Sequence, residues 1–88
     1  MNGFVHTRVH DFIKPKLGGR SLSDDDDIFA LGYVNSLFAV QLVRFIQREF
    51  DFELTSEDMD FDNFRTVDRI VRLIDSKTGA RTTPEGRL

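Results

Sequence analysis

The sequence contains no cysteine and no tryptophan among its 88 residues, and it has only two prolines. Without cysteine the chain has no disulfide framework, no thiol nucleophile and no cysteine-based zinc site. No apolar run approaches the roughly 18 residues needed to span a bilayer, and no basic stretch followed by an apolar one opens the chain. We therefore expect a cytoplasmic protein that makes no use of a membrane.

The sequence also has no excess of positive charge: it contains 12 basic and 15 acidic residues, and the net charge is −3. A sequence-independent hold on phosphate backbones needs the opposite balance, so nucleic acid is not an expected partner. The acid is concentrated in the block Asp24–Asp27 and in the segment Asp51–Asp62, whereas the chain after Ser76 is mildly basic. Local charge will therefore decide which proteins dock on which face.

The first helix is predicted over roughly residues 3–14, where Val5, Val9 and Phe12 recur at helical spacing. Pro15 and the following pair of glycines end it. A loop of about twenty residues comes next, which is unusual in a compact domain and calls for anchoring. The predicted anchors of this loop are its apolar side chains, Leu22, Ile28, Phe29 and Leu31.

The second helix is the clearest, because residues 37–50 include neither glycine nor proline and are apolar at 39, 42, 43, 46 and 50. Phe38, Val40 and Phe45 lie off this stripe. They are equally consistent with an exposed partner surface and with extra contacts to the long loop.

A short third helix is expected in the connection that follows, with Ser56 as its cap and Phe61 and Phe64 as its anchors. The last helix has Thr66 as N-cap and apolar residues at i, i+3, i+4 and i+7, and it ends near Asp75.

The fold class predicted from these elements is all-α, a small four-helix bundle with a long first loop and a short third helix. At this length the chain has room for one domain, which we place at residues 1–76. The remaining residues, 77–88, are rich in turn formers and predict a disordered tail.

Ser36, which stands at the start of the second helix, is the first candidate for chemistry. It has the preferred residue type for a helix N-cap, but Ala39 three residues later provides no capping box. The positive end of the helix dipole would stabilise a phosphodiester formed on its hydroxyl. A serine nucleophile is not favoured, since no strand precedes it and no catalytic base is in view.

Metal binding is a weaker interpretation of three other groups. His6 and His10 lie one turn apart, but a third ligand is not evident. Acidic residues at 58, 60 and 62 match an EF-hand loop only in part, because Asn63 and Arg69 replace its glycine and its bidentate glutamate. The block Asp24–Asp27 is better explained as a solvated charged loop. We expect no metal site.

Three motifs together resemble the acyl carrier protein family: "DDIFALG" at residues 26–32, Asn35-Ser36-Leu37, and Ala39-Val40-x-Leu42-Val43. The resemblance covers about residues 4–75. It implies that Ser36 carries a covalent 4'-phosphopantetheine whose thiol holds an acyl group, with Asn35 and Leu37 as its motif neighbours. It also implies a carrier that is not itself an enzyme.

The sequence departs from the family pattern in two places. Asn35 stands where the family usually has aspartate, which removes a negative charge beside the serine. The exposed face of the second helix, often acidic in fatty-acid carriers, is neutral to basic here, so specialised partners are expected. The predicted partner-binding residues are Phe38, Val40, Gln41, Arg44, Gln47 and Arg48.

The chain is most similar to free-standing carriers that supply unusual extender units to polyketide assembly lines. This resemblance implies hydroxymalonyl, methoxymalonyl or aminomalonyl cargo. The implied partners are a phosphopantetheinyl transferase, an acyl-loading enzyme, tailoring dehydrogenases and a polyketide synthase acyltransferase, and we expect a monomer. The alternatives are a peptidyl carrier, an unmodified helical interaction module in which Ser36 only caps, and a small metal-assisted hydrolase.

Overall fold

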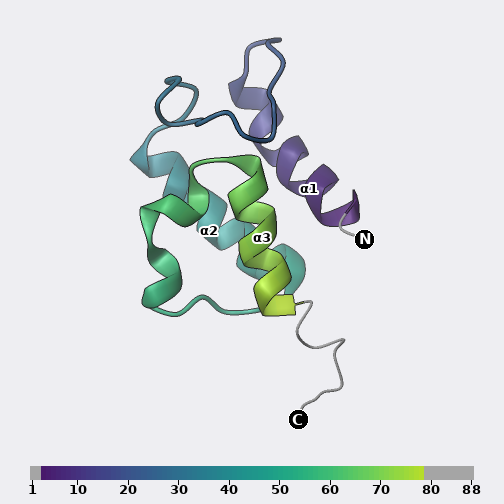
Figure 1. Ribbon diagram of the computed structural model, residues 1–88, viewed down its shortest axis with the longest axis vertical. Coiled ribbons are helices and arrows are strands. Elements are labelled where there is room, and N and C mark those ends of the chain that lie inside the picture. The colour runs from purple at the N-terminus through teal and green to yellow at the C-terminus, as the bar shows by residue number, and fades with distance from the viewer. Residues whose placement is uncertain (1–2, 79–88) are drawn as a thin grey trace.

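The computed structural model describes residues 3–78, which form three α-helices and no strand (Figure 1). The all-α class is therefore confirmed. Three short 3-10 turns complete the described elements. In chain order the elements are α1 (Gly3–Ile13), η1 (Lys14–Lys16), α2 (Ser36–Phe50), η2 (Glu57–Met59), η3 (Phe61–Phe64) and α3 (Val67–Thr78).

Helix α1 ends at Ile13, one residue before the predicted end. Pro15 lies in η1, and the backbone N–H of Leu17 donates to the carbonyl of Lys14 at 3.0 Å. Gly18 and Gly19 then take φ values of 61° and 87°, a left-handed conformation that costs glycine little. The chain can therefore leave the helix and begin the long loop, which crosses one end of the molecule in Figure 1.

Helix α2 buries a stripe that is shifted by one residue from the prediction at its start. Phe38, only 3% exposed, takes the place expected for Ala39, and Leu42 and Ile46 continue the buried stripe. The helix ends at Asp51, which adopts the left-handed conformation with φ 56°. The N–H of the next residue donates to the carbonyl of Gln47 at 3.2 Å, as in a Schellman motif.

The predicted short third helix is not found as an α-helix in residues 51–66, where η2 and η3 form instead. Its cap was also assigned to the wrong residue. The Thr55 N–H donates to the Asp58 carboxylate at 2.9 Å, the Asp58 N–H donates back to the Thr55 hydroxyl at 3.2 Å, and Ser56 makes no side-chain capping bond. This reciprocal pair closes the turn without an α-helical bond. Phe64 is buried as predicted, whereas Phe61 is 51% exposed.

Helix α3 has the predicted N-cap, since the Arg69 N–H donates to the Thr66 hydroxyl at 3.0 Å. It continues to Thr78, three residues beyond the predicted end. Lys77 is held there by Asp58 of η2, with 2.5 Å between Nζ and Oδ2. The rest of the predicted tail, residues 79–88, lies outside the described residues.

The core lies between the three helices and includes two residues from the long loop. The apolar side chains that are almost fully buried are Val9, Ile13, Leu17, Ile28, Phe38, Leu42, Ile46, Phe64, Val67, Ile70, Val71, Leu73 and Ile74. Of the predicted loop anchors, Ile28 is buried, Leu22 and Phe29 are half-buried, and Leu31 is exposed. The prediction for Leu31 is wrong: it lies in a turn closed by the bond from its N–H to the Asp27 carbonyl at 3.0 Å, and its side chain is 51% exposed.

Candidate functional site

Asn35, rather than Ser36, caps helix α2. Its extended backbone and its side-chain oxygen, which accepts from the Phe38 N–H at 3.1 Å, satisfy one of the open donors of the first turn. Ser36 is the first helical residue and is exposed. The interpretation of Ser36 as the cap is therefore wrong, because the preceding residue has already taken that role.

The Ser36 hydroxyl makes no hydrogen bond to another side chain or to the backbone within residues 3–78. It stands at the positive end of a 15-residue helix whose first turn contains no acidic residue. A phosphodiester on this hydroxyl would gain from the helix dipole and would meet no carboxylate in the same turn. The start of α2 therefore fits a phosphate-linked group on Ser36.

A tight loop fixes the direction from which the chain enters this site. The Ile28 carbonyl accepts from the N–H groups of Tyr33 and Val34 at 3.1 and 3.4 Å, and Gly32 has a φ of 82°. Ile28 is itself buried, and its N–H donates to the carbonyl of Arg65 at 2.9 Å. The loop is thus hydrogen-bonded to the segment before α3, and this bond also limits where the start of α2 can lie.

Comparison with known families supplies the identity of this arrangement. The family described as "Phosphopantetheine attachment site" matches residues 8–74, from α1 to the end region of α3. The chain belongs to this family. Searches of curated proteins and of solved structures gave no match.

Proteins of this family are carriers and are not themselves catalysts. The domain is the attachment point of a covalent 4'-phosphopantetheine, and the chain is an acyl or peptidyl carrier. Its partners are a phosphopantetheinyl transferase and biosynthetic enzymes that load and use the arm. None of the helices in residues 3–78 has the length and apolar character of a membrane span.

The predicted partner face of the carrier is only partly available. Val40, Gln41, Arg44 and Arg48 are exposed on α2. Phe38 is buried against Phe12, with ring centroids 5.4 Å apart, so it cannot contact a partner. The Gln47 amide oxygen accepts from the Leu54 N–H at 2.8 Å and therefore holds the connection after α2. The burial of Phe38 therefore argues against it as a partner-binding residue. Gln47 is half-buried and stays a predicted partner-binding residue.

Several large apolar side chains of α2 and of the segments before and after it are exposed. Leu37 is 66% exposed, and Val40 follows it one turn along the same helix. Leu31, in the loop before α2, is also exposed, and Phe61 lies against Phe29 with ring centroids 4.7 Å apart. Leu37 and Val40, which lie on α2 itself, are therefore suited to contacts with partner enzymes.

The residues considered for metal binding have structural partners. His6 Nε2 lies 2.6 Å from an Asp24 carboxylate oxygen, and the His6 and His10 rings stack. Asp58 pairs with Lys77, and Asp62 pairs with Arg65. Within residues 3–78 no cluster of three potential ligands is present.

Arg65 is a positioning residue that the sequence analysis did not single out. Its guanidinium bonds to the Asp27 carboxylate through Nε at 2.9 Å, while its carbonyl accepts from Ile28. Asp27 also accepts from the N–H groups of Phe29 and Ala30. No sequence signal joins residues 27 and 65, because the contact crosses 38 positions.

Alanine in place of Asn35 should destabilise the carrier by about 1 kcal/mol, within the 0.5–2 kcal/mol measured for N-cap losses. The reason is that the Phe38 N–H loses its acceptor. Urea unfolding followed by circular dichroism measures the change. Asn35→Asp is the matched control, since it keeps the acceptor and adds a charge that the dipole favours. Equal stability of Asn35→Ala and the wild type would contradict the assigned cap.

Asp27 should make the free energy of unfolding of the carrier depend on pH in the acid range. The hydrogen bond from the Ala30 N–H, aided by Arg65 and the Phe29 N–H, holds the pKa of Asp27 below its usual value. A lowered folded-state pKa gives stability that is complete above the unfolded pKa of about 4 and is lost as pH falls through the folded value.

We therefore expect Asp27→Asn to be less stable than the wild type at pH 6, and the difference to shrink as the pH falls from about 4 to 2. Urea unfolding at each pH measures this difference. A difference that stays constant over the whole range would show that the charge of Asp27 does not contribute.

Proposed function

We propose that Ser36 is the residue that carries the 4'-phosphopantetheine arm, and that the arm holds an acyl group as a thioester. The observation that supports this most directly is the division of roles at the start of α2. Asn35 satisfies the helix, so the adjacent Ser36 hydroxyl is exposed and unbonded among the described residues. A transferase can reach this hydroxyl without breaking any contact of the fold.

The chain's own residues hold and present the attachment point. The loop bonded to Arg65 and the Asn35 cap fix the first turn of α2, and the dipole of that helix stabilises the phosphodiester charge. The arm supplies the thiol that the cysteine-free chain lacks. Leu37 is exposed next to Ser36 and is placed to contact the transferase.

For the cargo, we propose an unusual extender unit of the hydroxymalonyl, methoxymalonyl or aminomalonyl type, used in polyketide or mixed polyketide-peptide biosynthesis in the cytoplasm. On this proposal the carrier meets an acyl-loading enzyme, tailoring dehydrogenases and a polyketide synthase acyltransferase. Support comes from the exposed face of α2, where Gln41, Arg44 and Arg48 replace the acid that general fatty-acid synthases expect. Aminoacyl cargo, as on a peptidyl carrier, is the second candidate.

Intact mass spectrometry tests both parts of this proposal. Treatment with coenzyme A and a broad-specificity phosphopantetheinyl transferase should add the mass of one phosphopantetheine at Ser36. The carrier isolated from cells that hold its own loading enzyme should then show a further mass equal to an extender unit. A further mass equal to an amino acid would overturn the cargo, and no gain in either sample would overturn the carrier role of Ser36.

A further inference from the structure

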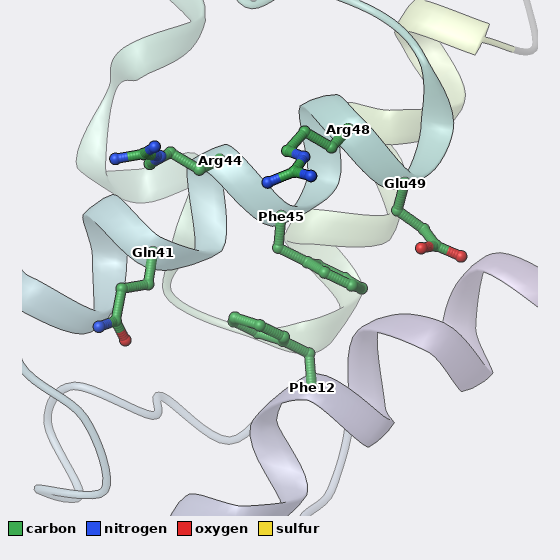
Figure 2. A pocket seen from close by; sticks show the side chains of 6 residues that line it. All are labelled: Phe12, Gln41, Arg44, Phe45, Arg48 and Glu49. Carbon is green, nitrogen blue, oxygen red and sulfur yellow. The ribbon is translucent and has the colours of Figure 1, made fainter.

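An open groove of about 740 Å³ lies between α1 and α2. Figure 2 shows Phe12 of α1 and Phe45 of α2 pointing toward each other, while Gln41, Arg44 and Arg48 extend from α2 beside them. The proposed function uses Gln41, Arg44 and Arg48 only as part of the outer face of α2 and assigns no role to the space between the two helices. Its shape and chemistry therefore call for a separate explanation.

The floor of the groove is apolar and consists of two stacked rings. The rings of Phe12 and Phe45 stack at a centroid distance of 4.2 Å with an interplanar angle of 12°. Phe12 also contacts the buried ring of Phe38. Both floor residues are half-buried, so part of each ring faces the groove. A short carbon chain can lie on such a surface and shield apolar area from water.

The wall of the groove carries positive charge that the fold does not neutralise. Arg44 and Arg48 are exposed, and within residues 3–78 neither has a carboxylate at ion-pair distance. Glu49, the acidic residue of the groove, is paired with Arg8, with 2.8 Å between Oε2 and Nε. Two guanidinium groups are thus free to bind an anion, and guanidinium matches the geometry of a carboxylate.

The groove lies within reach of Ser36. At a rise of 1.5 Å per residue, Arg44 is about 12 Å and Arg48 about 18 Å along α2 from Ser36. A phosphopantetheine arm has about as many chain bonds as five peptide units, so it extends to about 17 Å. The end of the arm can therefore lie beside Arg44 or between the two arginines.

The helix also provides a continuous path from the attachment point to the groove. Leu37, Gln41, Arg44 and Arg48 follow one another at spacings of four, three and four residues, which places them on one face of α2. Leu37 is next to Ser36 and exposed. An arm laid along this face would pass an apolar residue first, then an amide, and would reach the arginines with its acyl end.

We propose that this groove holds the acyl group of the carrier's own arm when that group bears a free carboxylate. The carboxylate pairs with Arg44 and Arg48, and the carbon chain covers the stacked rings of Phe12 and Phe45. This inference rests on the proposed function, because it requires the arm on Ser36, and it defines the cargo further as anionic. An uncharged acyl group of the same size has no partner for the arginines and is not retained.

Two acyl forms of similar size, one with a terminal carboxylate and one with an apolar end, provide the test. The chain is loaded by a broad-specificity transferase from malonyl-coenzyme A or from butyryl-coenzyme A, whose acyl groups are of similar length. Intact mass first establishes that each arm is present on Ser36. Nitrogen-15 NMR then compares the backbone and arginine Nε–H signals of the two forms, and a carbon-13 label on the malonyl methylene reports contacts with the phenylalanine rings.

We expect the malonyl form to shift the signals of Arg44 and Arg48 relative to the butyryl form, and to show contacts between the labelled methylene and Phe12 or Phe45. The double variant Arg44→Gln/Arg48→Gln should lose both effects. Both arginines are exposed, so this variant should keep the fold, which circular dichroism checks. The matched control replaces two exposed arginines of α3, Arg69→Gln/Arg72→Gln, and should keep both effects.

Groove signals that are the same in the two acyl forms, or shifts that persist in Arg44→Gln/Arg48→Gln, would overturn the proposal. Signals that move only when a partner enzyme is added, whichever acyl group is present, would assign the groove to protein docking and would also overturn it. A chain that gains no mass would overturn the proposed function, and this inference with it, so the two failures are distinguished by the mass spectrum.

Discussion

Replacing Ser36 with alanine is expected to abolish the gain of one phosphopantetheine and to leave the fold intact. The whole gain should be lost, because the hydroxyl oxygen becomes the bridging atom of the phosphodiester and alanine has no replacement for it. Stability should not fall, since that hydroxyl makes no hydrogen bond within residues 3–78 and alanine is the better helix former. Intact mass and circular dichroism measure the two halves of this result.

Ser56→Ala is the matched control for this experiment. Ser56 is another exposed serine before a helical turn, and its side chain makes no capping bond, so the variant should gain mass as the wild type does. A mass gain in Ser36→Ala would show that the arm is attached elsewhere. A wild type that gains nothing with several transferases would favour the unmodified interaction module, and Asn35→Asp would then test whether the missing charge beside Ser36 is responsible.

The second large effect concerns the core. Leu42→Ala should destabilise the carrier by about 2–5 kcal/mol, because a fully buried leucine is replaced by a cavity that rigid neighbours fill only in part. A domain of this size has a total stability of only about 4–11 kcal/mol at 0.05–0.15 kcal/mol per residue. Much of the margin would be lost, and urea unfolding should show a midpoint far below that of the wild type.

Val40→Ala provides the comparison on the same helix, two residues before Leu42. Val40 is 56% exposed, so its replacement should change the free energy of unfolding by no more than about 0.5 kcal/mol. Similar losses in the two variants would contradict the burial of Leu42. If neither variant lowered the urea midpoint, α2 would not pack into the core as described.

The three α-helices could be predicted from the sequence because each combines an apolar period with a local signal for its end. Pro15 and Gly18 stop α1, and Thr66 starts α3. The stripe of α2 was misplaced at its first turn, because Phe38 and Ala39 both lie near the edge of the apolar face. The larger ring is buried against Phe12, and that partner belongs to another helix.

The connection between α2 and α3 was predicted less well. Serine at 56 is a common cap, but the threonine before it and the aspartate three residues later form a reciprocal pair that decides the turn. A search of the sequence for capping boxes could therefore have identified Thr55 and Asp58 as the capping pair. The resulting turn is 3-10 rather than α-helical.

The candidate site shows the same limit. The motif around Ser36 could be read from the sequence by its resemblance to acyl carriers, but the cap had to be located by geometry. Asn35 and Ser36 are both good capping residues, and only the extended backbone of Asn35 decides between them. The groove between α1 and α2 could not be predicted from the sequence, because no spacing pattern relates Phe12 to Phe45.

The attachment of the long loop to the start of α3 has a consequence for how the protein is made. The loop before Ser36 is held by the carbonyl and guanidinium of Arg65, and the Asp68 N–H donates to the carbonyl of Asp24 at 2.9 Å. A ribosome releases the serine well before it releases these partners. We therefore expect the loop before Ser36 to lack these contacts on the nascent chain until residues 65–68 have emerged, so that Ser36 takes its final setting only after α3 has been made.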